Sequence, residues 1–280
     1  MKKVFFLLFI IFTTYSFSQE FIGRTYWSYI GFGDGGNGII YSFSDTLFTK
    51  TIDTYSEKDT SECFEYKLIY KNKIPFLKYK ENSQIIEVPV LYNNDYLFIL
   101  RKSIQDISYG TDFTPYCSGR FLTNSLAEPI IKNVDYVKYS SVLEEKDIIF
   151  SFAPHPVYLT MSPWVPDVKE DKNMSIEFTV YFGANTSDNN IILVNGFVNI
   201  EKTYLYEQNS RAKDIEVIFY DTTGKSKTES ILLEDTPNPQ LIKCPEDFIT
   251  KNVKIIIKST YQGSKYSDVA ISYIGYVYKK

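Results

Sequence analysis

Residues 195–220, NGFVNIEKTYLYEQNSRAKDIEVIFY, contain both a turn signal and a strand signal, and from them the fold can be predicted outward. The stretch opens with Asn195-Gly196, a pair that favours a turn in which the backbone takes a positive φ. It closes with a run from Ile215 to Tyr220 in which apolar and polar residues alternate. Alternation of period two is typical of an antiparallel strand with one buried and one wet face. The stretch therefore predicts a turn that leads into a half-buried β-sheet.

Similar runs surround this stretch, and the chain is predicted to be all-β. Its 24 Tyr and 21 Phe residues favour strands over helices. In the second half, Asn, Gly and Pro loops separate seven strand-like runs, which fit a two-sheet jelly roll: residues 147–152, 175–182, 191–194, 214–220, 230–233, 253–258 and 269–278.

The first half predicts a smaller β-rich barrel or sandwich. Its runs are short and evenly spaced: residues 23–30, 38–54, 63–70, 74–80, 84–91 and 96–100. Asn82-Ser83 and Asn93-Asn94-Asp95 predict hairpin turns. Residues 103–133 contain four Gly or Pro residues and little periodicity, so we place the domain junction there. The predicted domains are residues 19–130, of unknown function, and residues 131–280.

Several blocks in the second half together resemble one family. They are Ser162-Pro163-Trp164-Val165, Asn195-Gly196-Phe197, Asn209-Ser210-Arg211-Ala212-Lys213, Glu234-Asp235-Thr236 with Gln240, residues 261–268 (YQGSKYSD) and Ile271-Ser272-Tyr273-Ile274. This half of the chain resembles the discoidin-like, NADase-type glycan-binding domain. That domain is the translocation module of a streptococcal NAD glycohydrolase toxin and occurs on related secreted bacterial proteins. The resemblance implies a galactose-binding-like jelly roll in residues 131–280.

Two departures from the family pattern concern its ligand. Members usually carry Gly-Ile-Gly-Glu where this chain has residues 172–177, KNMSIE, and Ile-Ser-Glu-Ile where Tyr273 replaces the Glu. Loss of that carboxylate affects any ligand or ion that it helps to hold. The resemblance to the toxin does not extend to NAD cleavage, because it lies in the toxin's non-catalytic module.

Sugar recognition needs aromatic faces for the pyranose ring and planar polar groups for its hydroxyls, usually on loops. The resemblance makes six residues candidates for glycan binding: Trp164, Asn209, Arg211, Tyr261, Tyr266 and Asp268. A structural alternative stays open, in which Arg211 pairs with a buried acid and Trp164 closes one end of the sandwich. Five other motif residues are interpreted as marks of the fold rather than of function: Asn195, Gly196, Lys213, Ile271 and Ser272.

Residues 1–18 have the pattern of a secretory signal peptide, with Lys2-Lys3, an apolar run and a small-residue end. No other run is apolar for long enough to span a membrane as a helix. We therefore expect an exported protein that is periplasmic, on the cell surface or secreted, with no transmembrane anchor. The net charge of -4 makes nucleic acid a poor partner.

Three cysteines are an odd number for an exported protein. Cys63 and Cys117 fall in the same predicted domain and can form a disulfide, since export permits one. Cys244 is left over, and no base lies near it in the sequence to make it a nucleophile.

The chain offers little for catalysis. His155 is the only histidine, so a catalytic triad or a zinc site would depend on it. The glycine-rich residues 31–38 precede a strand-like run without a following Lys, which favours a hairpin loop over a phosphate cradle. Acidic clusters such as Glu144-Glu145 are interpreted as solvated loops. We expect no catalytic residues, no metal and no cofactor.

The sequence thus predicts an exported bacterial, non-catalytic carbohydrate-binding protein whose partner is a glycan or glycoconjugate. Two alternatives remain open. The chain can be an envelope scaffold that binds another surface protein. Or its first domain can be an enzyme or a small-molecule carrier, with the second domain as a targeting module.

Overall fold

The computed structural model describes residues 23, 25–30, 37–53, 60–100, 113–118, 129–146, 148–151, 163–169, 172–182 and 189–279. Some of the predictions fall on other residues. The signal peptide at 1–18, most of the glycine-rich loop at 31–38 and His155 lie outside the described residues. The division at residue 130 also stays a prediction, because residues 119–128 are not among those described.

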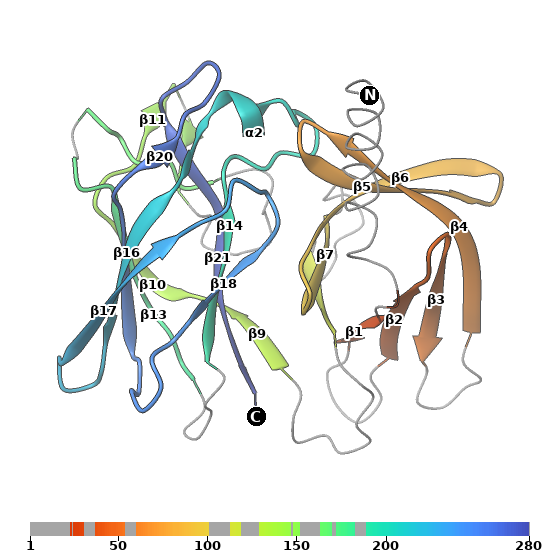
Figure 1. The fold of residues 1–280 in the computed structure, drawn as a ribbon, viewed down its shortest axis with the longest axis horizontal. Coiled ribbons are helices and arrows are strands. Elements are labelled where there is room, and N and C mark those ends of the chain that lie inside the picture. Colours follow the sequence, from red (N-terminus) through yellow and green to blue (C-terminus); the bar gives the residue numbers. More distant parts are fainter. Residues whose placement is uncertain are drawn as a thin grey trace, which may run out of the picture. The chain divides into compact units, whose positions relative to one another are not determined.

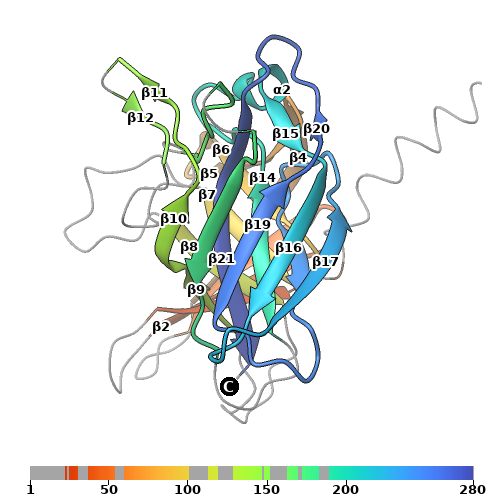
Figure 2. The same cartoon turned by 90° about the vertical axis from the view of Figure 1, so that its left-hand side faces the viewer.

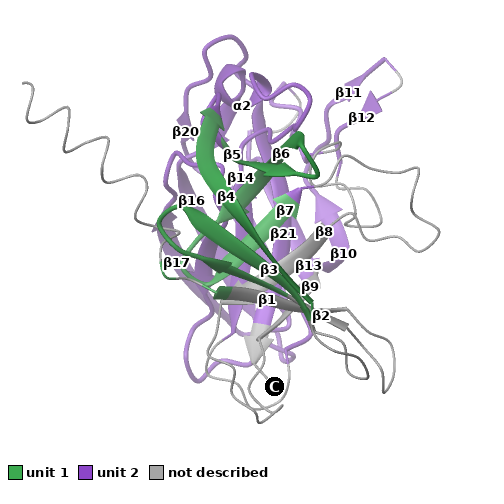
Figure 3. Ribbon diagram, turned by 90° about the vertical axis from the view of Figure 1, so that its right-hand side faces the viewer, with its two compact units in different colours: residues 1–70, 75–99, 114–121 green, residues 71–74, 100–113, 122–280 purple. Residues whose placement is uncertain are grey.

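By its internal contacts the chain divides into two compact units, which Figure 3 colours separately. Unit 1 comprises residues 1–70, 75–99 and 114–121. Unit 2 comprises residues 71–74, 100–113 and 122–280.

Unit 1 is built on a closed barrel in which β1 pairs with both β2 and β8. In chain order its strands are β1 (Thr25–Ile30), β2 (Asn37–Phe43), β3 (Leu47–Asp53), β4 (Thr60–Lys71), β5 (Ile74–Glu81), β6 (Gln84–Tyr92), β7 (Tyr96–Leu100) and β8 (Phe113–Ser118). The prediction of a β-rich barrel or sandwich is therefore confirmed as a barrel. Strand β8 was not expected, because its sequence resembles the loop-rich segment around it.

Two hairpin turns of the barrel contain the residues from which the sequence predicted them. Asn82 and Ser83 join β5 to β6 with φ values of 48° and 68°, and such positive values are typical of a tight hairpin turn. The side-chain Oδ1 of Asn93 accepts hydrogen bonds from the backbone N–H groups of Asp95 and Tyr96, at 2.9 and 2.8 Å. Both predicted hairpins are thus present. The single run predicted at 38–54 is instead two strands, because the chain turns after Ser44, whose N–H donates to the Leu47 carbonyl at 2.8 Å.

Aromatic rings make up much of the barrel core. Phe48 is only 1% exposed and its ring centroid lies 4.9 Å from that of Tyr79 and 5.0 Å from that of Phe64. Phe43 stacks on Phe48 at 5.7 Å. Edge and offset contacts of this kind are favoured by the ring quadrupoles. The Tyr- and Phe-rich composition is thereby explained for this unit.

The predicted Cys63–Cys117 disulfide is not formed, because Cys63 is a free, exposed thiol. The barrel order gives the physical reason. Cys63 is on β4 and Cys117 on β8, which are four strands apart in either direction around the barrel. Strands only two positions apart are already separated by about 9–10 Å. A disulfide needs Cα atoms within about 7 Å.

Unit 2 contains two main sheets (Figures 1 and 2). The first has five strands, in the order β10 (Asp135–Tyr139), β13 (Ser175–Thr179), β19 (Asn252–Ile257), β16 (Asp214–Tyr220) and β17 (Ser226–Leu232). The second consists of β18 (Gln240–Lys243), β14 (Asn190–Asn195), β21 (Val269–Lys279), β15 (Ser210–Ala212) and β20 (Thr260–Tyr261), with β9 (Pro129–Asn133) also paired to β21. A small hairpin of β11 (Glu144–Glu145) and β12 (Ile148–Ile149) and a one-turn helix α2 (Leu205–Gln208) complete it.

The core of unit 2 lies between the two sheets. On β16 the alternation read from the sequence holds, with Ile215, Val217 and Phe219 buried. They meet residues such as Leu193 and Ile274 of the second sheet in one apolar cluster. The expected all-β class and the jelly-roll sandwich are confirmed. Of the run predicted at 147–152, the structure describes residues 148–151, and within these Ile148–Ile149 form a strand whose two side chains are exposed.

Candidate functional site

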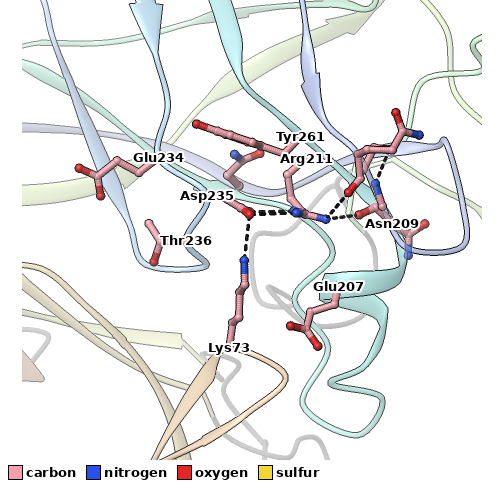
Figure 4. A network of polar contacts seen from close by, with 12 residues as sticks. Lys73, Glu207, Asn209, Arg211, Glu234, Asp235, Thr236 and Tyr261 are labelled. Carbon is pink, nitrogen blue, oxygen red and sulfur yellow. Dashed lines mark hydrogen bonds and ion pairs between the residues drawn. The ribbon is translucent and has the colours of Figure 1, made fainter. Parts of the chain in front are cut away.

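An ion pair between Arg211 and Asp235 lies at the centre of the motif blocks (Figure 4). Arg211 Nε donates to Asp235 Oδ1 at 2.9 Å, and its second terminal nitrogen donates to Oδ2 at 3.0 Å. The Arg211 side chain is 7% exposed and that of Asp235 26%. This two-point geometry satisfies a charge that would otherwise be costly to bury.

The remaining guanidinium nitrogen ties two chain segments together. Arg211 Nη1 donates to the carbonyl oxygen of Asn209 at 2.8 Å and to that of Gln262 at 3.4 Å. The guanidinium carbon also lies 5.6 Å from the ring centroid of Tyr206, which is fully buried. Arg211 therefore fixes the loop that follows β20 against the chain before β15.

Arg211 and Asp235 each shift the pKa of the other. Partial burial alone would raise the pKa of Asp235, but hydrogen bonds from Arg211 and Lys73 outweigh it and lower that pKa below its usual value. Lys73 belongs to unit 2 and places Nζ 2.8 Å from Asp235 Oδ2. Burial would lower the pKa of Arg211, and the Asp235 carboxylate raises it instead. Both groups are charged at neutral pH.

The Asn195-Gly196 turn shapes the space around this pair. The Asn195 side chain is fully buried and bonds to both backbone groups of Ala212, through Nδ2 to the carbonyl at 2.7 Å and through Oδ1 from the N–H at 3.0 Å. Gly196 has φ 84°, and a Cβ there would lie 2.5 Å from Tyr206 Cε2 and 2.8 Å from Arg211 Cγ. Only glycine fits this position without displacing its neighbours.

Strand β21 joins the turn to the Trp164 segment. The backbones of Ile271 and Trp164 exchange two hydrogen bonds, at 2.9 and 3.0 Å. The Ser272 hydroxyl donates to the Gly196 carbonyl at 2.7 Å and accepts from the N–H of Val198 at 2.8 Å. These contacts favour the structural interpretation of Asn195, Gly196, Ile271 and Ser272.

Beyond this buried layer, the loop at residues 262–268 is held against α2 by its backbone. The N–H groups of Ser264 and Tyr266 donate to the carbonyls of Glu207 and Gln208, at 2.9 and 2.8 Å. Gly263 donates to the Ser210 hydroxyl at 3.1 Å, and a Cβ on Gly263 would collide with surrounding backbone. The loop is therefore ordered before any ligand arrives.

Two tyrosines and a lysine are among the side chains that face solvent at this end of the sandwich. Tyr204 and Tyr266 are 45% and 37% exposed, and Lys265 Nζ lies 4.8 Å from the ring centroid of Tyr266. A hydrogen bond with Tyr266 raises the pKa of Lys265, with smaller contributions from the charges of Tyr266 and Tyr204. We call Tyr204, Lys265 and Tyr266 the tyrosine patch.

The six candidate residues separate by depth. Trp164 is 0% exposed, and its Nε1–H donates to the Ser141 carbonyl at 3.0 Å. Asn209 and Arg211 are buried as well, at 7% and 6%. Burial of these three favours the structural alternative, because a side chain inside the sandwich offers no face to a ligand.

The other candidates lie nearer the surface. Tyr261 is partly buried, and its hydroxyl donates to the Leu233 carbonyl at 2.9 Å. Lys213 Nζ lies 5.8 Å from the Tyr261 ring, so this motif lysine helps to fix the aromatic side chain. Asp268 is also partly buried, and its carbonyl accepts from the N–H of Ser210 at 2.9 Å. Tyr266 is the exposed one of the six.

Three important residues were not predicted as part of the site. Asp235 stands within a motif block and Tyr206 within the stretch 195–220, but their sequence positions do not reveal that both contact Arg211. The signal for Asp235 was the buried-acid alternative for Arg211, since Glu234-Asp235 is an acidic pair in the same family motif set. Tyr204 carries no sequence signal of its own, and it becomes a candidate only through its position near the loop at residues 262–268. Tyr273, which replaces the family Glu, is 4% exposed within β21.

Two features are absent from the described part of the chain. Within it, no three His, Cys, Asp or Glu side chains are grouped so that they could hold a metal ion. Among the same residues, no helix has the length and apolar character needed to cross a membrane.

The sandwich, its buried Arg-Asp pair and its loop-bearing end define a discoidin-like domain. The chain belongs to the family of NAD glycohydrolase translocation F5/8 type C domains, whose model matches residues 132–277. Membership in this family suggests an exported protein. No curated protein was found to match the chain.

Proposed function

We propose that the protein is an exported, non-catalytic carbohydrate-binding protein and that its ligand binds at the tyrosine patch. The observation that carries the proposal is a pair of exposed tyrosines at one end of the sandwich, with Tyr266 on the pre-ordered loop at residues 262–268 and Tyr204 at the start of α2, against which that loop is held. Family membership supports the exported part of the proposal, because the match is to a translocation module.

The patch has the chemistry that a sugar requires. The rings of Tyr204 and Tyr266 can stack on the apolar face of a pyranose, while their hydroxyls and Lys265 can bond to its hydroxyl groups. Beneath them the loop backbone is fixed by α2 and by Ser210. A rigid site loses little conformational entropy on binding, which improves affinity.

A single patch of this size is expected to bind weakly. A solvated sugar exchanges hydrogen bonds with water for hydrogen bonds with protein, so each one contributes little net free energy. Useful affinity would then depend on several sites that engage one multivalent target.

Glycan-array binding by the full chain tests the proposal. Tyr204→Ala and Tyr266→Ala are each expected to lower the signal at least about tenfold. A stacked aromatic ring, together with the apolar area that it buries, contributes about 1.5 kcal/mol or more to binding. Tyr136→Ala is the matched control, because Tyr136 is 81% exposed and belongs to β10. It should leave binding unchanged.

Two other outcomes would favour a different function or a different binding site. If no glycan binds and a surface protein is captured instead, the scaffold alternative replaces this proposal. Equal losses in Tyr136→Ala and Tyr266→Ala would place the ligand elsewhere.

A second candidate function concerns unit 1. Its closed eight-stranded barrel with aromatic core residues has an architecture that can hold one small apolar ligand. A small-molecule carrier predicts that apolar compounds raise the melting temperature of unit 1, and Phe48→Ala should change which compounds do so. A barrel that no compound stabilises would eliminate this candidate.

A further inference from the structure

Strand β17 forms one edge of the five-stranded sheet of unit 2 (Figure 2). Among the described strands it pairs only with β16. Residues 226–230 are exposed, and Leu232 is 65% exposed. An edge strand of this length presents a row of backbone N–H and C=O groups that can pair with another strand.

The hydrogen bonds at the two ends of β17 show which groups are free to do so. Leu233 N–H donates to the Lys213 carbonyl at 2.8 Å, and Asp221 N–H donates to the Lys225 carbonyl at 3.0 Å. Hydrogen-bonded positions alternate along an antiparallel pair. Odd-numbered residues of β17 therefore bond to β16. The backbone groups of Ser226, Thr228 and Ser230 point away from it.

We propose that β17 pairs antiparallel with β17 of a second copy of this chain, around a two-fold axis at Thr228. In this register Thr228 lies opposite Thr228 of the second copy, and Ser226 lies opposite Ser230. The outward backbone groups of all three residues then form hydrogen bonds across the axis. The two five-stranded sheets become one continuous sheet, an isologous interface of the kind most homodimers use.

Charge complementarity selects this register. With the axis at Thr228, Lys227 lies opposite Glu229 of the second copy, and symmetry repeats the pair. These are non-hydrogen-bonded positions, where facing side chains are closest. Moving the axis by one residue would set Lys227 against Lys227 or Glu229 against Glu229. Moving it to Ser226 would set Lys225 against Lys227, and moving it to Ser230 would set Glu229 against Ile231.

The two charged side chains lie where such pairs can form. Lys227 and Glu229 are partners of the buried Phe219 and Val217 on β16, so they lie on the core-facing side of the sheet but at its uncovered edge. Lys227 Nζ also donates to the Glu246 carbonyl at 3.3 Å and lies 5.4 Å from the Phe248 ring. Charges at such positions discourage pairing with unrelated strands. A second copy supplies the opposite charge.

Sedimentation equilibrium of the full chain, from about 1 μM to about 1 mM, tests the proposal over the range in which small interfaces associate. A reversible monomer–dimer equilibrium is expected. Lys227→Glu and Glu229→Lys should each raise the dimer Kd about tenfold, because each replaces two attractive pairs by two repulsive ones. Thr228→Pro should abolish the dimer while leaving the bonds between β16 and β17 intact, because proline removes only an outward N–H.

The charge-swapped double variant, Lys227→Glu with Glu229→Lys, is the decisive case. It restores both cross-strand pairs and should bring the dimer Kd back to within about threefold of the original value. Lys172→Glu, an exposed change of the same charge outside β17, should have no effect. A chain that stays monomeric throughout, a dimer indifferent to the single changes, or a double variant that remains monomeric would each overturn the proposal.

Discussion

Replacing Gly196 by Ala is expected to destabilise unit 2 for two separable reasons. At φ 84° an alanine adopts the left-handed region, which costs about 1–2 kcal/mol. Its Cβ would also lie 2.5 Å from Tyr206 Cε2 and 2.8 Å from Arg211 Cγ. Tyr206 is fully buried and Arg211 is held by Asp235, so neither can move freely. Overpacking of this kind adds about 1–3 kcal/mol.

Gly224→Ala is a matched control for the free-energy cost of placing alanine at a positive φ. Gly224 has φ 85°, and no atom lies within 4 Å of the position its Cβ would take. It should therefore show the conformational cost alone, about 1–2 kcal/mol. Urea unfolding can be followed by Trp164 fluorescence in a Trp27→Phe background, since the chain has two tryptophans. With a slope near 2 kcal/mol per molar, the midpoint should fall by about 1–2.5 M for Gly196→Ala and by less than about 1 M for Gly224→Ala.

Equal midpoint shifts in the two variants would mean that the contacts of Tyr206 and Arg211 contribute nothing to the loss of stability. A third variant isolates the cause. In a Tyr206→Ala background the added methyl group meets less resistance, so the further loss from Gly196→Ala should approach that of Gly224→Ala. A loss unchanged by Tyr206→Ala would show that the overlap with the tyrosine ring was misjudged.

The Arg211–Asp235 pair predicts a dependence of stability on pH. Because the pKa of Asp235 is lower in the folded than in the unfolded state, its contribution is fully present above about pH 4 and is lost as pH falls through the folded pKa. Asp235→Asn should therefore lose less stability than the original chain between pH 6 and pH 2.5, measured by urea midpoints; parallel curves would contradict this. The cysteines predict a second difference, because burial raises the pKa of Cys244 to about 12 whereas Cys63 is exposed. In a Cys117→Ser background a thiol reagent should label Cys63 in the folded protein and Cys244 only after unfolding, as read by mass spectrometry, and rapid labelling of Cys244 without denaturant would show that its pocket opens.

Local patterns predicted much of the fold. The alternation from Ile215 to Tyr220 identified a strand with one buried face, since side chains on a strand point to opposite sides in turn. Asn82-Ser83 identified a hairpin, because few residue types accept positive φ at two successive positions. Such signals depend on residues that are neighbours in the sequence, so the sequence alone was enough to find them.

Long-range pairing could not be predicted in the same way. Trp164 was proposed as a sugar contact because it belongs to one of the motif blocks that resemble the glycan-binding family. Its backbone bonds to Ile271, more than a hundred residues later, and these bonds place its side chain in the core. Cys63 and Cys117 are in the same barrel, yet only the closing order of the strands shows that they are on opposite sides of it. The tyrosine patch likewise depends on α2 lying against the loop after β20.

The two hydrogen bonds between the Asn195 side chain and the Ala212 backbone also have a chemical consequence. Asparagine followed by glycine is the dipeptide most prone to deamidation, since the glycine nitrogen can attack the side-chain carbonyl carbon and close a succinimide ring. Here the amide group of Asn195 is engaged on both sides by Ala212, and the Gly196 N–H donates to the Ala270 carbonyl at 2.9 Å. Neither reacting group is available while the sandwich stays folded. Aspartate at position 195 would therefore accumulate only in molecules that have opened, and its fraction in aged protein would record how often unit 2 unfolds.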